Sequence, residues 1–385
     1  MRSRDIIIFI TLVLLIYSAA CTFLYFKGAS AFSGIMDNNI YTALFITVSV
    51  TFIAGKLLER VSSSVIADIL NVIGGFWLSF MLYSVIIIIA ADLLRLVLEL
   101  SGIIIPGVSD QFRQYSYLIA FGLTILIIIA GFLNTVSPVT KKYRVTLNKP
   151  AKTKEIRIAA VSDIHLGSVL RKRSMRVLSR KLEALAPDMV LFLGDLIDGE
   201  IGPVIRDDLL DSLKIPESVK YVFAITGNHE YIGGHSKTIP YIESKGIRIL
   251  LDEVVTLEEG VQLAGRKDRD SQRYTGQQRK DLADLLEGTD SKKPVIVLDH
   301  QPPLKNDDNI ASFDIMLSGH THNGQMWPLN YLTARLYKIS YGHRKIDGTH
   351  HIVSSGYGTW GPRVRLGSRS ELIDISLTFN NQMDD

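Results

Sequence analysis

Hydrophobic positions are arranged in two different ways along the chain, and the change falls near residue 135. Before it lie four long apolar stretches without a polar face, at residues 6–26, 40–58, 72–98 and 115–133. Each is close to the roughly 20 residues that a helix needs to cross a bilayer. A helix packed in a soluble bundle would instead keep a polar stripe toward water. We therefore expect an all-α transmembrane domain of about four helices over residues 1–134.

Beyond that point the apolar runs become short and the polar residues more frequent. Residues 135–154 contain two prolines and many lysines, which predicts an interfacial linker. From residue 155 onward, short apolar strands alternate with amphipathic stretches that predict helices at residues 175–186, 205–213, 236–245 and 277–287. This alternation predicts an α/β domain over residues 155–385, with a sheet layer and helices outside it.

Composition and charge narrow the class of protein. Hydrophobic residues make up 47% of the 385 positions, which is too apolar for an ordinary soluble enzyme. A net charge of +3 gives no strong field, and no aromatic and basic residues interleave on a platform, so no nucleic acid partner is expected. The single cysteine, Cys21, excludes an intramolecular disulfide. The sequence gives no indication of the oligomeric state.

Charged residues between the apolar stretches predict the orientation in the membrane. Arg2 and Arg4, Lys56 and Arg60, and six Lys or Arg residues between 141 and 154 fall on one side. The other side carries fewer, mainly Lys27 and Arg113. Because Lys and Arg are enriched in cytoplasmic loops, we expect a multi-pass protein of the cell membrane with the C-terminal domain in the cytoplasm. A span count that differs by one would face this domain outward instead.

Metal-ligand side chains follow five of the short apolar runs. The runs 156–161, 189–193, 221–225, 295–298 and 315–317 lead into Asp163 and His165, Asp195 and Asp198, Asn228 and His229, His300, and His320 and His322, respectively. In extended backbone, side chains at i and i+2 leave on the same face. Ligand sites of α/β sheets lie outside the carboxyl ends of the strands, so we expect these groups to converge in one pocket.

The ordered series Asp-x-His, Gly-Asp-x-x-Asp, Gly-Asn-His-Glu, a lone His and Gly-His-x-His resembles the calcineurin-like metallophosphoesterases. The resemblance covers about residues 155–378 and points to membrane-associated, bacterial-type members with an N-terminal multi-span region. It implies a two-sheet β-sandwich flanked by helices and a pair of divalent metal ions. In the family's pattern the first ion is held by Asp163, His165 and His322, the second by Asn228, His300 and His320, and Asp195 bridges the two.

The same resemblance assigns roles around the metals. His229 would protonate the leaving oxygen or stabilise the phosphoryl oxygens. Carboxylate, carboxamide and imidazole ligands without thiolates suit Mn²⁺, Fe²⁺ or Zn²⁺, so the metal's identity stays open. Asp198 and Glu230 are assigned to positions behind the ligands, where either could hold a ligating histidine instead of touching metal.

Three residues are predicted to contact the substrate, namely Arg363, Arg365 and Trp327. The aromatic segment 326–331 either borders the active site on the membrane side or packs as part of a loop. The basic residues between 171 and 181 either hold anionic head groups or form a solvated helix face.

These observations predict a membrane-anchored, dinuclear metal-dependent phosphoesterase. A metal-activated hydroxide would hydrolyse a phosphodiester or phosphomonoester, and we expect the diester. Similar membrane-associated members act on lipid or lipid-linked phosphates, which favours that class of substrate for this protein. The alternative is a metal-dependent sensor or regulatory module coupled to the spans, against which the complete ligand set and His229 argue.

Overall fold

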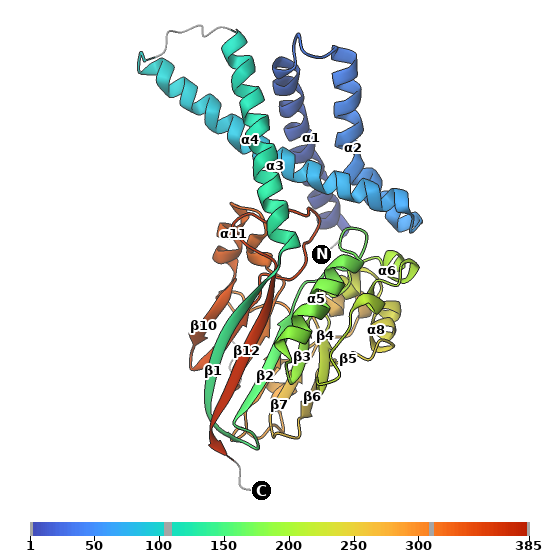
Figure 1. Ribbon diagram of the computed structural model, residues 1–385, viewed down its shortest axis with the longest axis vertical. Coiled ribbons are helices and arrows are strands. Elements are labelled where there is room, and N and C mark those ends of the chain that lie inside the picture. The colour runs from blue at the N-terminus through green and yellow to red at the C-terminus, as the bar shows by residue number, and fades with distance from the viewer. Residues whose placement is uncertain (1–2, 104–109, 308–311, 383–385) are drawn as a thin grey trace. The chain divides into compact units, whose positions relative to one another are not determined.

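The structure of the chain is a computed structural model that describes residues 3–103, 110–307 and 312–382. Arg2, one of the charges behind the predicted orientation, lies outside these residues. The contacts divide the chain into two compact units, Met1–Gly131 and Phe132–Asp385 (Figure 1). Each unit is described separately below.

The first unit is built from long apolar helices: α1 (Ser3–Ala31), α2 (Asn38–Val61), α3 (Val65–Leu100) and most of α4 (Asp110–Val136). Four segments are long and apolar enough to cross a membrane, namely Ile10–Ala31, Asn38–Val61, Val65–Leu100 and Gln111–Val136. Many of their large apolar side chains, such as Ile16 and Leu126, are exposed, which water would disfavour and lipid would accept. The prediction of four such helices is confirmed, with most of their ends lying beyond the predicted bounds.

Charged groups inside this unit satisfy one another. The Lys27 Nζ atom lies 2.6 Å from Asp92 Oδ2 and 2.7 Å from the Tyr117 hydroxyl oxygen. These contacts join α1, α3 and α4. Polar groups within membrane helices are usually paired in this way, because hydrocarbon offers them no other partner.

Two six-stranded sheets form the second unit, with strand orders β1-β12-β2-β3-β4-β5 and β10-β11-β9-β8-β7-β6. The first sheet contains β1 (Val139–Ala151), β12 (Glu371–Gln382), β2 (Glu155–Val161), β3 (Met189–Leu193), β4 (Tyr221–Ile225) and β5 (Arg248–Ile249). The second contains β10 (Gly342–Ile346), β11 (Thr349–Val353), β9 (Ile315–Ser318), β8 (Val295–Leu298), β7 (Gln262–Gly265) and β6 (Glu253–Thr256).

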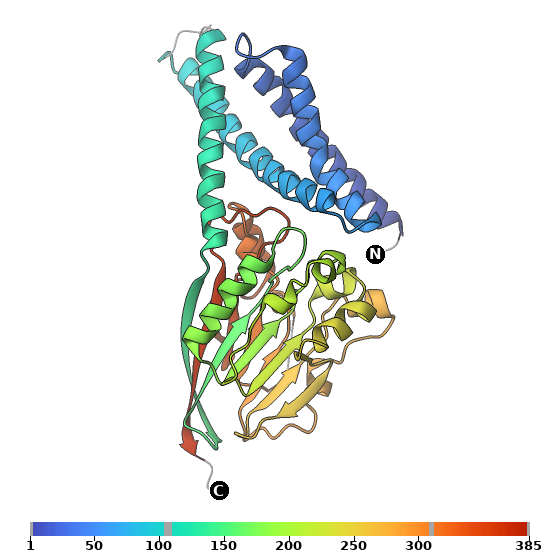
Figure 2. The ribbon, with the colours of Figure 1, turned by 45° about the vertical axis from the view of Figure 1, so that its right-hand side comes forward.

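The sheets pack face to face around one hydrophobic core, to which Ile158 and Leu191 contribute from the first sheet and Ile296 and Leu317 from the second. The outer face of the first sheet is covered by α5 (Lys172–Leu185), α6 (Gly202–Arg206) and α8 (His235–Glu243) (Figure 2). Helix α10 (Leu282–Leu286) packs on the outer face of the second. The predicted two-sheet sandwich flanked by helices is confirmed.

Residues 135–154 differ from the expected linker, because Val139–Ala151 form strand β1, which pairs in parallel with β12. Val145 and Leu147 point inward and are buried, while Arg144 before them and Thr146 between them are exposed. A strand that buries one face shows this alternation. The alternation was hidden because it covers few residues, and Lys141, Lys142 and Lys149 around it do not follow it.

The strands that precede the predicted ligands share a direction within each sheet. Strands β2, β3 and β4 are parallel neighbours in the first sheet, and β7, β8 and β9 in the second. Their carboxyl ends therefore lie together at one edge of the sandwich. Strands β3, β4 and β8 begin and end at the predicted residues, whereas the helix expected at 277–287 begins only at Leu282.

Candidate metal centre and active site

Tight turns at the strand ends direct the predicted ligands into one place. Five of these residues have positive φ angles between 48° and 67°: Asp163, His165, Asp195, His320 and His322. Residues other than glycine adopt this conformation at a cost, and such strained positions cluster at functional sites. The strain in these turns lowers the stability of the fold, but it directs these side chains into the site.

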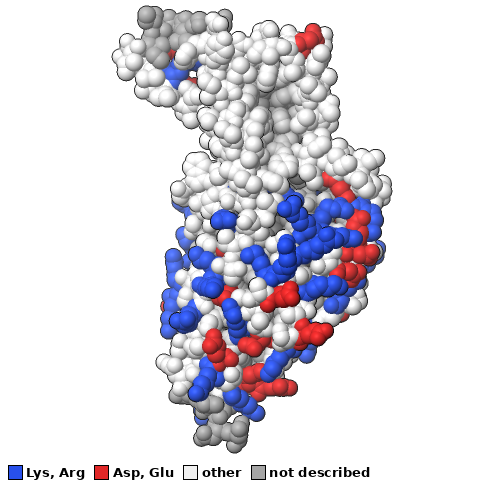
Figure 3. All heavy atoms as spheres, in the orientation of Figure 1, with Lys and Arg blue, Asp and Glu red and all other residues white. Residues whose placement is uncertain are grey.

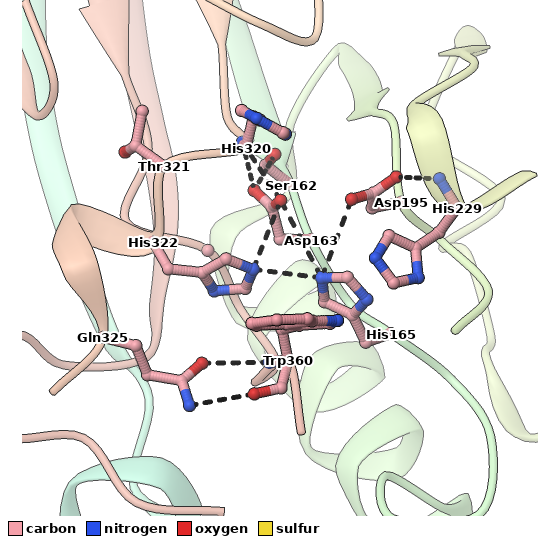
Figure 4. Close-up of polar contacts among 12 residues, drawn as sticks. Ser162, Asp163, His165, Asp195, His229, His320, Thr321, His322, Gln325 and Trp360 are labelled. Atoms are coloured by element: carbon pink, nitrogen blue, oxygen red, sulfur yellow. Dashed lines mark hydrogen bonds and ion pairs between the residues drawn. The ribbon is translucent and has the colours of Figure 1, made fainter. Parts of the chain in front are cut away.

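A first group of ligand atoms comes from Asp163, His165 and His322. The Nε2 atoms of His165 and His322 lie 3.0 Å apart, and Asp163 Oδ1 lies 3.5 Å from the latter. All three side chains are buried and converge on one point (Figure 4). Two imidazole nitrogens this close need a proton or a cation between them.

A second group comes from Asp195, His300 and His320. His300 Nε2 lies 3.2 Å from Asp195 Oδ2, and His320 Nδ1 lies 3.1 Å from Asn228 Oδ1. Asp195 Oδ2 is also 3.8 Å from His165 Nε2, so this carboxylate lies between the two groups.

Both groups fit divalent cations. Within the described part of the chain, the buried Nε2 of His300 has no hydrogen-bond partner, although a carboxylate lies beside it, and a metal ion would use that lone pair. The donors are oxygen and imidazole nitrogen, which suit borderline and hard divalent ions. The clustered Asp and His residues are compatible with a dinuclear metal site.

Asp198 and Glu230 lie behind these residues. Asp198 Oδ1 is 3.2 Å from His165 Nδ1 and 3.1 Å from His229 Nδ1, so one carboxylate oxygen sets the orientation of both imidazole rings. Glu230 accepts hydrogen bonds from the backbone N–H groups of Asp195, Ile197 and Gly227 at 2.7–3.1 Å. Glu230 therefore supports the turns after β3 and β4, and its hydrogen bonds among the described residues go to backbone N–H groups, not to a histidine.

The neighbours of each ionisable group shift its pKa. Burial opposes protonation of His229, but the charges of Asp195 and Asp198 raise its pKa to about 9. Burial, helped by the charge of His300, lowers the pKa of His320 to about 3. Burial alone would raise the pKa of Asp198, but its contacts with His165 and His229 hold that pKa far below its usual range.

Comparison with known proteins places the chain in a family. A model of the calcineurin-like phosphoesterases matches residues 156–324. An uncharacterized metallophosphoesterase of Aquifex aeolicus is 33% identical over 239 residues, which cover 62% of this chain and 90% of that protein. The chain belongs to the calcineurin-like metallophosphoesterases.

Other relatives of this metallophosphoesterase are matched over less of their length. A transmembrane protein with metallophosphoesterase domain from Bos taurus is 31% identical over 276 residues, covering 67% of this chain and 62% of that protein. An uncharacterized metallophosphoesterase of Helicobacter pylori is 35% identical, with coverages of 60% and 61%. Among solved structures, a 5'-nucleotidase precursor from Thermus thermophilus matches with 15% identity, a TM-score of 0.36, and coverages of 58% and 54%.

A cavity of about 580 Å³ opens above the metal-ligand groups of the metallophosphoesterase. Its polar floor includes His165, Asp195, Asn228, His229, His320 and His322. Its wall is apolar and comes mainly from Met326, Leu329, Leu332, Leu336, Trp360 and Ile232. Leu329, Leu332 and Leu336 belong to helix α11 (Leu329–Leu336), in which no residue is buried.

The structure places the three predicted substrate contacts outside this cavity. Arg365 is fully buried and donates to the carbonyl oxygens of Ser355 and Gly358 at 2.6 and 2.7 Å. Arg363 lies against the Phe132 ring, and Trp327 is not among the lining residues. Polar or aromatic character near a motif does not reveal in which direction a loop side chain points.

Met326 and Leu329 of the segment 326–331 line the cavity, which agrees with one of the two alternatives given for that segment. The rest of the apolar wall, namely Leu332, Leu336, Trp360 and Ile232, was missed. Trp360 lies 35 residues beyond Gln325, whose Nε2 atom donates to the Trp360 carbonyl oxygen at 3.1 Å (Figure 4). The signal available in the sequence was the spacing of Leu329, Leu332 and Leu336, which lines one face of a helix.

Proposed function

We propose that this metallophosphoesterase hydrolyses a lipid-linked phosphodiester at a dinuclear metal centre. The observation that supports it is the composition of the cavity, whose floor is built mainly of predicted metal ligands and whose wall is built mainly of leucines and Trp360. A phosphate joined to an acyl or isoprenoid group has the same division into a charged end and an apolar end.

The site residues divide the chemical work. Two divalent ions, when bound by Asp163, His165, His322, Asp195, Asn228, His300 and His320, supply a hydroxide nucleophile and offset the charge on the phosphoryl group. His229 lines the cavity with its Nδ1 at Asp198, so its Nε2 would be the atom available to the substrate. In this position His229 would donate a proton to the leaving oxygen.

The apolar wall is the part that a soluble substrate would not need. Leu332 and Leu336 are 56% and 48% exposed, and exposed leucines in a water-facing cavity are unfavourable. An alkyl chain lying along α11 would cover them. The loop that carries Trp360 also reaches the last turn of α4, since Arg363 stacks on Phe132 with 5.4 Å from its guanidinium carbon to the ring centroid. This turn ends the fourth apolar span, so a substrate anchored in the bilayer lies within reach.

We also propose that the domain faces the cytoplasm of the cell. Lys141, Lys142 and Arg144, which follow the fourth span, are all exposed on β1. Such an excess of basic residues is typical of the cytoplasmic side. A C-terminal tag should then be protected from protease in intact cells and cleaved after permeabilisation, whereas cleavage in intact cells would contradict this orientation.

Hydrolysis itself is tested with bis-p-nitrophenyl phosphate and p-nitrophenyl phosphate in the presence of Mn²⁺. We expect metal-dependent release of nitrophenol that is lost in both Asp195→Asn and His229→Ala, with the diester preferred. Metal bound without turnover of any ester would favour the sensor function over the enzyme.

The lipid preference is tested by a matched pair of changes on α11. Leu332 lines the cavity, while its neighbour Tyr331 is 66% exposed and does not. Leu332→Ser should raise KM for a long-chain phosphodiester, leaving the rate with bis-p-nitrophenyl phosphate unchanged. Tyr331→Ser should affect neither substrate. Equal rates of wild type and Leu332→Ser on the lipid would refute a role for this wall.

A further inference from the structure

Arginine side chains that the active site does not use surround the last turn of α4. This turn, Phe132–Val136, belongs to the same compact unit as the phosphoesterase domain. A notch of about 10 Å³ lies against it, which is room for one oxygen atom. Its walls are Thr135, Val136, Pro138, Leu170, Arg173, Ser174, Val177, Tyr357 and Arg363.

The two arginines of the notch have no carboxylate partner in the part of the chain that the structure describes. Among the described residues neither Arg173 nor Arg363 forms an ion pair, and the buried Nε of Arg363 has no hydrogen-bond partner. Burial lowers the pKa of Arg363, and the charge of Arg173 lowers it further. Stacking on Phe132 holds the Arg363 guanidinium in place. Arg173 is exposed and Arg363 is half-buried, so two positive charges border the notch and both would attract an anion placed there.

The location of the notch indicates the source of that anion. The fourth apolar span ends at Val136, so the residues around this turn lie where a bilayer's head groups begin. Helix α5 continues the positive surface outward, with Arg176 and Arg180 exposed one and two turns beyond Arg173. Lys and Arg side chains gather over α5 on the face shown in Figure 3. Clusters of this kind beside a membrane span attract anionic lipids.

We propose that Arg173 and Arg363 bind the phosphate of an anionic phospholipid head group at the end of the fourth span. One phosphoryl oxygen would enter the notch, and the others would face the two guanidinium groups, whose planar forks match phosphate oxygens. This site is separate from the catalytic cavity, because neither arginine lines that cavity. The proposal does not depend on the substrate that the enzyme hydrolyses.

The test counts lipids held by the full-length protein in detergent, using native mass spectrometry. Phosphatidylglycerol, phosphatidylcholine and inorganic phosphate are the three probes. The test variant combines Arg173→Gln with Arg363→Gln, and the control combines Arg176→Gln with Arg180→Gln, so that both lose two charges. We expect wild type and control to retain phosphatidylglycerol equally and the test variant to bind it at least about tenfold more weakly.

Three outcomes would overturn the proposal. Equal loss of phosphatidylglycerol from both double variants would show only a diffuse attraction to α5. Equal retention of phosphatidylcholine by wild type would show that the head group's charge is not recognised. Displacement of the lipid by an equal concentration of inorganic phosphate would indicate a free-anion site. If the test variant has a lower unfolding temperature than wild type, Arg363→Lys replaces it, since this change keeps the charge and removes the planar fork.

Discussion

Nη2 of Arg365 lies 3.0 Å from Nδ1 of His322, one of the candidate metal ligands. The backbone carbonyl of the same arginine accepts a hydrogen bond from Asn134 Nδ2 at 3.1 Å. Arg365 thus joins the last turn of α4 to the metal-ligand cluster through a single residue. Burial lowers the pKa of Arg365 to about 10, which still leaves the guanidinium charged at neutral pH.

Replacing Arg365 should damage both stability and metal binding. Arg365→Met leaves the carbonyl groups of Ser355 and Gly358 without donors in a buried place, which should cost about 3 kcal/mol of unfolding free energy. The loop would then release His322, and we expect the protein to hold about one metal ion per chain instead of about two. Thermal unfolding and elemental analysis measure the two effects.

Two further variants separate positioning from charge. Arg365→Lys keeps the positive charge but lacks the planar, forked donor group of arginine. We therefore expect partial rescue of stability and little rescue of metal content. Arg344→Met removes an exposed arginine of β10 and should leave both quantities unchanged. Full metal content in Arg365→Met would show that His322 needs no such support.

Asp198 should act through the two histidines that it contacts. Asp198→Asn preserves the shape but removes the charge, whereas Asp198→Ala removes both contacts. We expect kcat/KM to fall by about tenfold and about 100-fold, respectively, with weaker Mn²⁺ binding in both variants. Asp207, which pairs with Arg171 outside the cavity, provides the control, and Asp207→Ala should remain within about twofold of wild type. An Asp198→Ala variant with normal Mn²⁺ affinity would contradict this role.

Removal of metal should destabilise the domain, because buried Asp163, Asp195 and their histidines lose the cations that offset them. Ions present at about 100 times their dissociation constant would stabilise the folded state by about 2.7 kcal/mol. We expect chelation to lower the unfolding temperature and Mn²⁺ to restore it.

A second histidine pair provides the control for that experiment. His343 Nε2 and His350 Nδ1 lie 2.9 Å apart on β10 and β11, away from the cavity. A variant with both changed to Ala should respond to Mn²⁺ as wild type does, while Asp195→Asn should respond less. If Mn²⁺ failed to stabilise only the variant without His343 and His350, the stabilising metal would be bound by that surface pair.

The sequence was sufficient to predict the strands that carry the ligands, since short apolar runs ending in Asp or His are visible without a structure. Strand β1 was missed because its inward residues, Val145 and Leu147, are few and surrounded by lysines. The inward direction of Arg365 depends on its hydrogen bond to the Ser355 carbonyl within the same loop and on its contact with His322 in a distant segment. Contacts between distant segments leave no periodic signal.

Glu230 shows a related limit. Its place beside His229 in the motif suggested contact with a histidine, and the structure instead directs it at three backbone N–H groups of two turns. The sequence position of a carboxylate indicates that it lies near the site, but its partner depends on how the turns after β3 and β4 approach each other.

Gly319 provides a test of how closely the turn after β9 approaches the turn after β2. A methyl group added at Gly319 would collide with the Ser162 hydroxyl and the Asp163 carboxylate, and it would lie 2.7 Å from the Ser162 Cβ atom. The same addition at Gly167, also beside the site, meets nothing nearer than the Asp198 Cβ atom at 3.5 Å, an ordinary contact.

We therefore expect opposite results from the two glycine variants. Gly319→Ala should displace Asp163 and reduce turnover by about 100-fold or more, since small shifts of catalytic groups are costly. Gly167→Ala should keep most of the activity and metal. Nitrophenol release and bound Mn²⁺ are measured for both. Full activity of Gly319→Ala would mean that the Ser162 and Asp163 side chains can move aside without loss, and that the close approach of these two turns is not needed to assemble the metal centre.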